Sequence, residues 1–478
     1  MNYTSILKQK SFVCGEWLTG SSEQLEVKNK YTGETIAKVP FGTAEDMEKA
    51  ITGATKAITT LKSWSQEQRS DALRKLKNAL EQQKEKFIDL IIAESGKPRG
   101  YAQAEIARCL ATLAIASEEA MRFDGEVVPI DFGAGKGRHG YTKKFPVGPI
   151  ACISPFNFPL NLALHKIAPA IAVGASVVLK PSPFAPLTAL AFAGLLKETD
   201  LPPGAVNILV CKSEVAQAMI TDPRMKMLSF TGSPQVGWHL KSIAGHKKVT
   251  LELGGNAAVI VDESSDYNAA AKLVATGTYL YAGQVCISTQ RILVADTIYD
   301  KFVATLRKEI QEIKCGDPAL DGVICGPMIN KDHLRRIESW VNEAVTQGAE
   351  VLAGGTVLSE ANNVYAPTLL TKTKPSMKVV CDEVFAPVGV IEKFRTIDEA
   401  IHQVNDSKFG LQCGVFTNRI DVMKKTFTEI EVGGVMINNV PGFRLDNMPY
   451  GGVKDSGLGR EGIKYAMEDM TETRILIY

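Results

Sequence analysis

Between residues 150 and 252 the sequence repeatedly alternates short apolar runs with segments of helical character. We expect strands over 150–154, 176–179, 206–210, 225–230 and 248–252, and helices over 160–173 and 186–197, with shorter helices between the later strands. Parallel neighbouring strands need a crossover connection, usually a helix, so this alternation predicts a parallel sheet covered on both faces. The expected fold class is therefore α/β.

The same alternation restarts after Gly254, with strands expected over 258–261, 291–294, 388–392, 412–416 and 435–438. It predicts a second α/β domain. Residues 43–122 have helical periodicity, with Thr43 and Asp46 as a capping box and further helices starting near Ser65 and Lys97. Residues 125–145 alternate and contain many glycines and charges, which is typical of a hairpin or arm.

The bulk composition excludes several classes of partner. Lys plus Arg number 54 and Asp plus Glu 53, so the formal net charge of +1 gives no electrostatic reason to expect nucleic acid or a membrane. The longest apolar stretch, 168–179, is too short to span a bilayer, and the first ten residues lack the apolar core of a signal peptide. Nine scattered cysteines indicate reduced thiols, and six histidines lack ligand spacing. We expect a cytoplasmic protein without a metal.

One carboxylate and one thiol are the first candidates for chemistry. Glu252 ends an expected strand ahead of two glycines, and Cys286 follows an expected helix in a glycine-containing turn. Proteins of the α/β class place their sites at the carboxyl ends of strands. A thiol that traps a carbonyl, with a base that activates water, is the minimum for covalent acyl chemistry. From these residues alone, a buried cysteine and a solvated glutamate are the alternative.

Several further motifs accompany these two residues. They are SPFNFPL at 154–160, KPS at 180–182, FTGSPQVG at 230–237, EVFAP at 383–387 and PYGGVK at 449–454, while Glu252 and Cys286 are 34 residues apart. In these motifs and their order, the sequence resembles the aldehyde dehydrogenase superfamily over almost its whole length. The resemblance implies an enzyme that oxidises an aldehyde to a carboxylic acid with NAD or NADP.

The resemblance implies a role for each catalytic residue. Cys286 would attack the aldehyde to form a thiohemiacetal, and loss of hydride would leave a thioester. The side-chain N–H of Asn157, with the backbone N–H of Cys286, would stabilise the alkoxide, and Glu252 would activate the water that releases the acid. A turn-capping asparagine and a structural glutamate are the alternatives.

The resemblance also implies the cofactor contacts. Gly232, Ser233 and Gly237 match the loop and helix start that carry the pyrophosphate, where backbone N–H groups favour an anion. Lys180 matches the residue that holds the adenosine ribose, and Glu383 matches the carboxylate for the nicotinamide ribose. Strand-end charges and turn glycines are the alternative. The other positions assigned to this site are Ser154, Phe156, Ser182, Pro183, Leu253 and Phe385.

Some positions depart from the family pattern. Phe156 stands where Trp is common, and Ala386 replaces the usual Gly after Phe385. Pro183 stands where NAD-preferring members commonly have Glu, which binds the ribose and repels a 2′-phosphate. Proline can do neither, so both NAD and NADP stay open as cofactors.

Two arginines bear on the substrate. Arg108 and Arg444 lie at places similar to those where members acting on small anionic aldehydes keep anion-binding arginines. Val285 stands where such members carry an arginine before the nucleophile. Two structural arginines are therefore an equal alternative, and the aldehyde is not identified.

The resemblance assigns expected roles to the domains. Residues 1–123 and 143–251 would form the dinucleotide-binding domain and 252–440 the catalytic domain. Residues 124–142 and 466–478 would form an oligomerisation arm and terminal strand, whose unpaired edges predict a homodimer or homotetramer. The sequence GKGRHG at 135–140 satisfies GxGxxG but precedes no apolar helix, so we expect a glycine turn in the arm.

Two other functions stay as alternatives. One is a CoA-acylating semialdehyde dehydrogenase of the same fold, although such relatives generally lack the glutamate found here at 252. The other is a non-catalytic structural protein on this scaffold, which the joint presence of Cys286, Asn157 and Glu252 disfavours.

Overall fold

The computed structural model describes residues 3–478 and contains two large parallel sheets. The first has eight strands in the order β2-β1-β9-β8-β7-β10-β11-β23. Its inner strands are parallel, and the edge strands β1, β2 and β23 pair antiparallel. The strands are β1 (Phe12–Val13), β2 (Glu16–Trp17), β7 (Ile150–Ile153), β8 (Val177–Lys180), β9 (Val206–Ile208), β10 (Met227–Thr231), β11 (Lys248–Glu252) and β23 (Gly457–Leu458). The parallel sheet predicted for 150–252 is confirmed.

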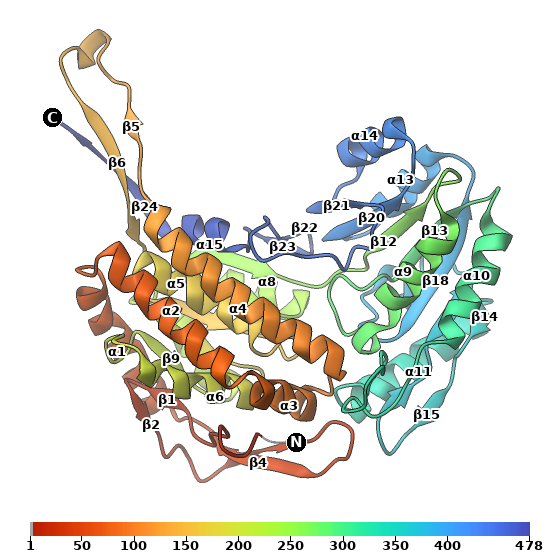
Figure 1. Cartoon of the computed structure of the whole chain (residues 1–478), viewed down its shortest axis with the longest axis horizontal. Coiled ribbons are helices and arrows are strands. Elements are labelled where there is room, and N and C mark those ends of the chain that lie inside the picture. The colour runs from red at the N-terminus through yellow and green to blue at the C-terminus, as the bar shows by residue number, and fades with distance from the viewer. Residues whose placement is uncertain (1–2) are drawn as a thin grey trace.

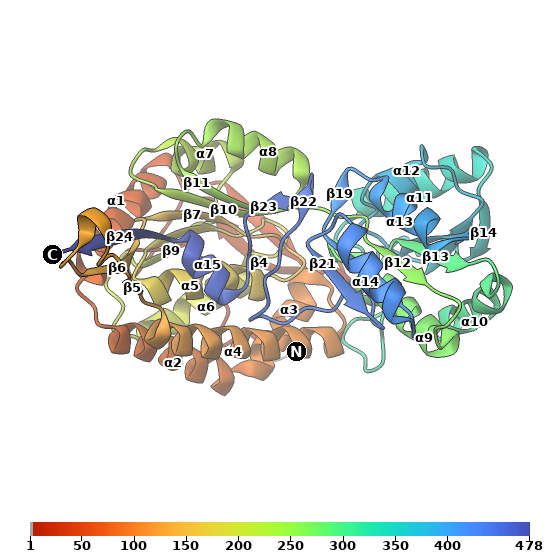
Figure 2. The same cartoon turned by 90° about the horizontal axis from the view of Figure 1, so that it is seen from above.

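Helices cover both faces of this sheet because successive strand side chains point to opposite sides. Ile150 and Cys152 pack in one apolar core with α2 (Gln66–Gln82), α3 (Lys84–Ser95), α4 (Arg99–Arg122), α5 (Asn161–Val173) and α6 (Leu187–Leu195). Ala151 packs in a second core with α1 (Ala44–Leu61), α7 (Ser213–Thr221) and α8 (Pro234–Ile243). Figure 2 shows α7 and α8 on one side of the sheet and α2 and α4 on the other.

The second sheet has the order β14-β17-β18-β13-β12-β20-β21 and lies beside the first (Figure 2). Its strands are parallel except at the β14 edge. They are β12 (Ala258–Val261), β13 (Arg291–Ala295), β14 (Glu350–Ala353), β17 (Thr368–Thr371), β18 (Val388–Phe394), β20 (Gln412–Phe416) and β21 (Gly434–Ile437). Around it pack α9 (Tyr267–Tyr279), α10 (Tyr299–Gln311), α11 (Lys331–Thr346), α12 (Lys378–Cys381), α13 (Ile397–Asn405) and α14 (Ile420–Glu429). The second α/β series predicted from the sequence is present.

An arm projects from the first sheet (Figure 1). It consists of β5 (Val127–Val128), the short helix η1 (Gly133–Gly135) and β6 (Gly140–Pro146), and β24 (Thr471–Ile477) pairs antiparallel with β6. Val127 is 83% and Phe132 72% exposed, so the arm presents apolar side chains and an unpaired strand edge. The 135–140 glycines lie in this arm and open no dinucleotide-binding helix.

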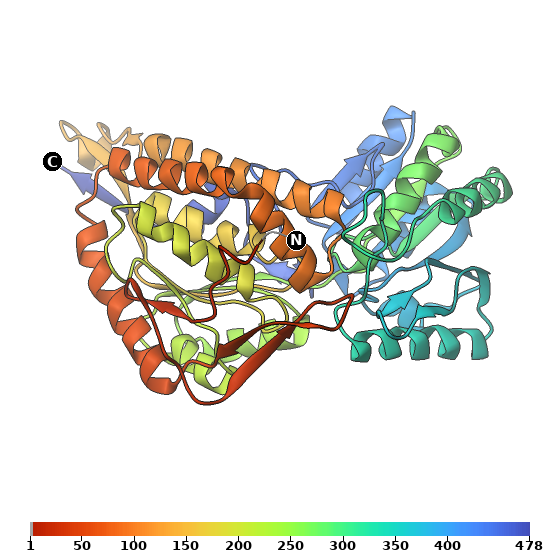
Figure 3. The same ribbon diagram turned by 60° about the horizontal axis from the view of Figure 1, so that its bottom comes forward.

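The smaller paired strands are β3 (Gln24–Lys28) with β4 (Thr35–Pro40), β15 (Val357–Ser359) with β16 (Val364–Tyr365), and β19 (Phe409–Gly410) with β22 (Val453–Lys454). Short 3₁₀ segments are η2 (Leu196–Glu198) and η3 (Leu280–Gly283), and the last helix is α15 (Ile463–Asp469). Figure 3 shows the β3–β4 hairpin running along the edge of the molecule below α3.

The predicted helices of 43–122 need one correction. The Thr43–Asp46 capping box opens α1, and Ser65 caps α2. However, α2 stops at Gln82, and a separate helix, α3, precedes the one expected near Lys97. The break is at Gln83, whose φ of −116° and ψ of 12° leave the helical region without any glycine or proline to mark it.

Residues 441–462 belong to neither predicted domain. Their strand β23 joins the first sheet beside β11, pairing Gly457 with Glu252, whereas β22 pairs with β19 at the second sheet. This segment therefore connects the two sheets at the place where β11 ends. The boundaries predicted for the two domains stay a prediction.

Candidate active site

Hydrogen bonds of the Gln284 side chain fix the shape of the loop that carries Cys286. It follows η3, where Tyr281 and Ala282 have left-handed φ values of 49° and 54°. Gln284 is fully buried, and its Nε2 donates to the carbonyls of Tyr281 (3.3 Å) and Pro327 (3.2 Å). Its Oε1 accepts from the backbone N–H of Ile329 at 2.8 Å. Because every polar atom of this side chain is bonded, the turn before Cys286 has one defined shape.

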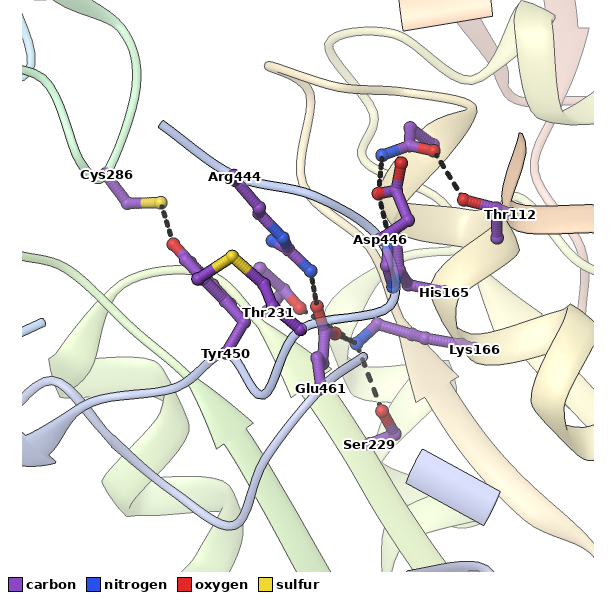
Figure 4. A network of polar contacts seen from close by, with 12 residues as sticks. Thr112, His165, Lys166, Ser229, Thr231, Cys286, Arg444, Asp446, Tyr450 and Glu461 are labelled. Atoms are coloured by element: carbon purple, nitrogen blue, oxygen red, sulfur yellow. Dashed lines mark hydrogen bonds and ion pairs between the residues drawn. The ribbon is translucent and has the colours of Figure 1, made fainter. Parts of the chain in front are cut away.

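The thiol of Cys286 lies 3.1 Å from the hydroxyl of Tyr450 (Figure 4). Both residues belong to one apolar cluster with Phe158, Tyr281 and Leu411. Burial raises the pKa of Cys286 to about 11, against the lowering effect of the Tyr450 hydrogen bond. The thiol is therefore held neutral at pH 7 and needs a base to become a nucleophile.

Asn157 lies beside this loop. Its Nδ2 donates to the backbone carbonyl of Gln284 at 3.0 Å, and its Oδ1 is buried with no hydrogen-bond partner in residues 3–478. The side-chain orientation is fixed, since a flipped amide would set two acceptors against each other. One amide N–H is thus used on Gln284, two residues before Cys286, and the second has no hydrogen-bond partner among residues 3–478.

Glu252 ends β11 in a buried position, 3% exposed. Neither of its carboxylate oxygens has a hydrogen-bond partner within the described chain. Burial, followed by the charge of Glu461, raises its pKa well above the usual range. A Cβ at position 451 would lie 2.8 Å from Glu252 Oε1, so Gly451 leaves room for this carboxylate.

The two glycines after Glu252 are explained by close approaches. A Cβ at Gly254 would meet Glu383 Oε2 at 2.4 Å, and one at Gly255 would meet the Cys286 carbonyl oxygen at 2.8 Å. The N–H of Gly255 donates to Glu383 Oε1 at 3.0 Å, and burial raises the pKa of Glu383 to about 7. The predicted cofactor carboxylate, the predicted base and the predicted nucleophile therefore lie around one backbone turn.

A buried ionic network backs the site (Figure 4). The guanidinium of Arg444 stacks 3.6 Å from the ring centre of Tyr450, and its Nη2 donates to Glu461 at 3.0 Å. Lys166 donates to Glu461 at 3.1 Å and to Ser229 at 3.0 Å. Burial raises the pKa of Glu461, but the charges of Lys166 and Arg444 prevail and hold it at about 2.

Arg108, the second predicted substrate arginine, makes a bidentate salt bridge with Asp446, with N–O distances of 2.7 and 3.3 Å. Asp446 also contacts His165 Nε2 at 2.7 Å. Arg108 lies 5.7 Å from the ring centre of Phe158, which packs in the cluster of Cys286. Both arginines thus reach the edge of that cluster, and each already has a carboxylate partner.

The predicted cofactor residues gather at the carboxyl ends of β8, β10 and β11. Lys180 ends β8, is buried, and has no ion pair to a carboxylate among residues 3–478; burial lowers its pKa. Ser182 is buried and Pro183 exposed in the turn that follows. The side chain of Ser154 is buried, and its hydroxyl has no bonding partner in the part of the chain described.

Gly232 and Ser233 lead into α8, and Ser233 makes no side-chain cap, which leaves the first N–H groups of the helix open. Gly237 has a packing role, because a Cβ there would meet Leu253 at 2.4 Å. Phe156 and Phe385 pack edge to face, with ring centres 5.8 Å apart. These residues fit a nicotinamide dinucleotide: open donors for its phosphates, an unpaired lysine at its ribose and a buried hydroxyl that lacks a partner.

Sequence reasoning gave no role to Tyr450, Glu461, Lys166 or Asp446. Tyr450 lies in the PYGGVK motif, and His165 and Lys166 are adjacent polar residues in the apolar helix α5. Those were the available signals. No group of three His, Cys, Asp or Glu side chains in 3–478 is arranged to hold a metal ion, and no helix there is long and apolar enough to cross a membrane.

Comparison with known proteins gives concordant results. The model of the aldehyde dehydrogenase family matches residues 17–476. The chain is 42% identical to a 3-sulfolactaldehyde dehydrogenase of Priestia aryabhattai (99% of this chain, 98% of that protein). It is 36% identical to a lactaldehyde dehydrogenase of Methanococcus aeolicus, over 98% of this chain and 99% of that protein.

Two solved structures are also similar. Aldehyde dehydrogenase 21 of Physcomitrella patens, in complex with its reaction product succinate, has a TM-score of 0.95 at 39% identity, covering 98% of each chain. A glyceraldehyde-3-phosphate dehydrogenase of Methanocaldococcus jannaschii complexed with NADP has a TM-score of 0.91 at 36% identity, covering 96% of this chain and 100% of that one. The chain therefore belongs to the aldehyde dehydrogenase family, and it is an enzyme that oxidises an aldehyde to an acid with NAD or NADP.

Proposed function

We propose that the enzyme oxidises a short aldehyde bearing an anionic group, with Cys286 as nucleophile, Glu252 as base and Arg444 as the principal anion-binding residue. The observation that carries this proposal is the stack of Arg444 on Tyr450, whose hydroxyl contacts the Cys286 thiol. Nε of Arg444 is buried without a hydrogen-bond partner in residues 3–478. A buried unpaired donor costs about 1–3 kcal/mol unless something binds to it. A substrate oxyanion satisfies it.

Each chemical step falls to a residue already placed. Cys286 loses its proton and attacks the carbonyl carbon, and the free N–H of Asn157 supports the resulting oxyanion. Lys180, Glu383 and the start of α8 would hold the nicotinamide dinucleotide, which would supply the hydride acceptor for this oxidation when bound. Glu252 takes a proton from water, which attacks the thioester and releases the acid. The raised pKa of Glu252 makes its carboxylate a stronger base than an ordinary one. The same shift means that a smaller fraction of Glu252 is ionised at neutral pH.

Three of the similar proteins support an anionic substrate. A sulfolactaldehyde carries a sulfonate, glyceraldehyde 3-phosphate a phosphate, and succinate a second carboxylate, and the proteins named for them or holding them are 36–42% identical to this chain. Arg108 is the second candidate for that group, with 25% of its side chain exposed beside Phe158. An arginine fork suits all three oxyanions.

Replacing Arg444 with lysine should raise the KM for succinic semialdehyde by about tenfold to a hundredfold, from a lost charged hydrogen bond worth about 1.5–3 kcal/mol. Lysine keeps the positive charge beside Glu461 but has no Nε–H donor. The KM for butanal, a neutral aldehyde of the same carbon number, should stay within about twofold. Steady-state kinetics on both aldehydes decide the matter, and equal increases would mean that Arg444 is structural.

We also propose that NADP is accepted beside NAD. Pro183 offers no carboxylate to repel a 2′-phosphate, and Lys180 is a buried cation without an ion pair in the described residues. Replacing Pro183 with glutamate should lower kcat/KM for NADP by at least about tenfold and leave that for NAD unchanged or higher. Absence of turnover of the unaltered enzyme with saturating NADP would refute the proposal.

The arm supports assembly. We propose a homodimer or homotetramer in which the exposed β5–β6 hairpin and the edge of β24 pair with another copy, because an apolar unpaired edge is otherwise unprotected.

A further inference from the structure

Two free cysteines face each other outside the active site. Cys315 and Cys325 are partners in an isolated parallel bridge in the connection between α10 and α11. The N–H of Cys325 donates to Lys314 O, and that of Gly316 donates to Cys325 O, both at 3.1 Å. Bridge partners lie about 5 Å apart at Cα with their side chains on the same side, which is within the range that a disulfide spans.

The two thiols differ in access. Cys315 is half-buried and lines a cavity of about 410 Å³ together with Arg307, Gln311 and Leu358, whereas Cys325 is fully buried behind it. The Sγ of Cys315 lies 3.5 Å from the Ile313 carbonyl oxygen, and that of Cys325 lies 3.9 Å from the Tyr365 carbonyl oxygen. The neighbouring Cys325 thiol lowers the pKa of Cys315, whereas Cys315 and burial raise the pKa of Cys325. An accessible thiol of lowered pKa with a buried neighbour is the arrangement in which one cysteine attacks and the other resolves.

The segment that follows Cys325 holds the nucleophile loop. The N–H of Tyr281 donates to Ile324 O at 2.9 Å. Gln284, two residues before Cys286, binds Pro327 O and the N–H of Ile329. The backbone from Ile324 to Ile329 is therefore hydrogen-bonded directly to the turn that presents Cys286.

We propose that Cys315 and Cys325 form a thiol–disulfide exchange site that reacts with a small-molecule disulfide and, once oxidised, slows the enzyme. The Cys315 thiolate attacks one sulfur of the reagent, breaking its S–S bond and releasing one thiol. The Cys325 thiol then attacks Cys315 Sγ, releases the second thiol and closes the Cys315–Cys325 bond. The reagent takes up two electrons and two protons, and the protein loses two hydrogen atoms. A reducing dithiol reverses both steps.

Peptide mapping tests the covalent step without any turnover. Trypsin cleavage after Lys314 and Lys331 gives one peptide, 315–331, that contains both cysteines and no other. After exposure of the full-length enzyme to oxidised glutathione and alkylation with iodoacetamide, this peptide should lack two hydrogen atoms and carry no alkyl group. A peptide alkylated at both positions, or one with a lasting glutathione adduct, would overturn the proposal.

Two variants separate the roles. In Cys325→Ala, Cys315 should accumulate as the glutathione adduct, because no thiol resolves it. In Cys315→Ala, the buried Cys325 should remain reduced and be alkylated after denaturation. An adduct on Cys325 in place of Cys315 would contradict the assignment of the attacking thiol. Cys315→Ala alters a half-buried side chain, so this part of the test does not depend on replacing the fully buried Cys325.

The activity test rests on the aldehyde oxidation described above and can fail independently of the mapping. Oxidised wild-type enzyme should lose about tenfold to a hundredfold in kcat, as expected for a small displacement of a catalytic group, and recover with dithiothreitol. Cys315→Ala treated in parallel reports any oxidation of Cys286 and should keep its rate. Equal losses in both proteins would refute control of turnover by this pair.

Discussion

Replacing Cys286 with alanine should reduce aldehyde-dependent cofactor reduction by at least about four orders of magnitude, since no covalent intermediate can then form. Serine should do little better. The serine hydroxyl is far less acidic than a thiol, and even the thiol here has its pKa raised to about 11. The Tyr450 hydroxyl is the only side-chain hydrogen-bond partner of the Cys286 sulfur among residues 3–478, so no side chain hydrogen-bonded to this position is a dedicated base. Absorbance of the reduced cofactor measures the loss.

Cys14→Ala is the matched control for this substitution. Cys14 is also a half-buried free thiol, in the turn between β1 and β2. It should retain the wild-type rate. Turnover by Cys286→Ala above about one hundredth of the wild-type rate would show that another residue is the nucleophile.

Replacing Glu252 with glutamine should lower steady turnover by about two to four orders of magnitude while leaving one round of hydride transfer intact. Glutamine resembles the neutral acid that the raised pKa already favours, so the buried site should tolerate it. Stopped-flow measurement should show a burst of reduced cofactor, one per chain, and then slow release. Wild-type steady turnover in Glu252→Gln would contradict the assigned base.

The pH dependence of the burst separates two roles of Glu252. The raised pKa of Cys286 means that the thiolate fraction grows as pH rises toward about 11. If Glu252 also takes the proton from Cys286, the burst of Glu252→Gln should be slow at neutral pH and accelerate as pH rises. If it serves hydrolysis alone, the burst should match that of the wild type at each pH. Glu383 is a second, half-buried carboxylate at the same turn, and Glu383→Gln should raise the KM for cofactor and show no burst.

Much of the fold followed from local pattern. Strand–helix alternation marks β7 to β11 because their side chains are buried on both faces, and the Thr43 capping box marks the start of α1. The α2–α3 break was missed because Gln83 leaves the helical conformation without a sequence signal. Local patterns do not report such a break when packing of both helices against α4 determines it.

The sequence indicated some residues of the candidate site and gave no sign of others, for a related reason. Glu252 and Cys286 each follow a recognisable element, and the glycines beside Glu252 are explained by Glu383 and the Cys286 carbonyl. The groups that set their environment come from far away in sequence. Tyr450 is 164 residues from Cys286, and Glu461 is 295 from Lys166. Only the fold brings the 441–462 segment back against β11, so no spacing in the chain indicates these contacts.

The two predicted substrate arginines show the same limit. Arg108 and Arg444 are 336 residues apart in the sequence, and only the family resemblance relates them. Nothing in the sequence shows a carboxylate partner for either. In the folded chain both lie at the cluster of Cys286, one above Phe158 and the other above Tyr450. Their pairing with Asp446 and Glu461 is a long-range property of the fold. The sequence shows that both side chains are cationic, but it does not show that each one is paired with a carboxylate.

The acyl-enzyme itself gives the most direct test of the proposed mechanism. In this mechanism Cys286 carries the substrate as a thioester, and water activated by Glu252 hydrolyses it. Glu252→Gln is mixed with succinic semialdehyde and NADP or NAD, quenched in acid after the burst, and digested with trypsin. Cleavage after Lys272 and Arg291 isolates Cys286 as the only cysteine of peptide 273–291. We predict that this peptide gains the mass of the succinyl group in an amount equal to the reduced cofactor formed. An unmodified peptide alongside a full burst of reduced cofactor would contradict the account.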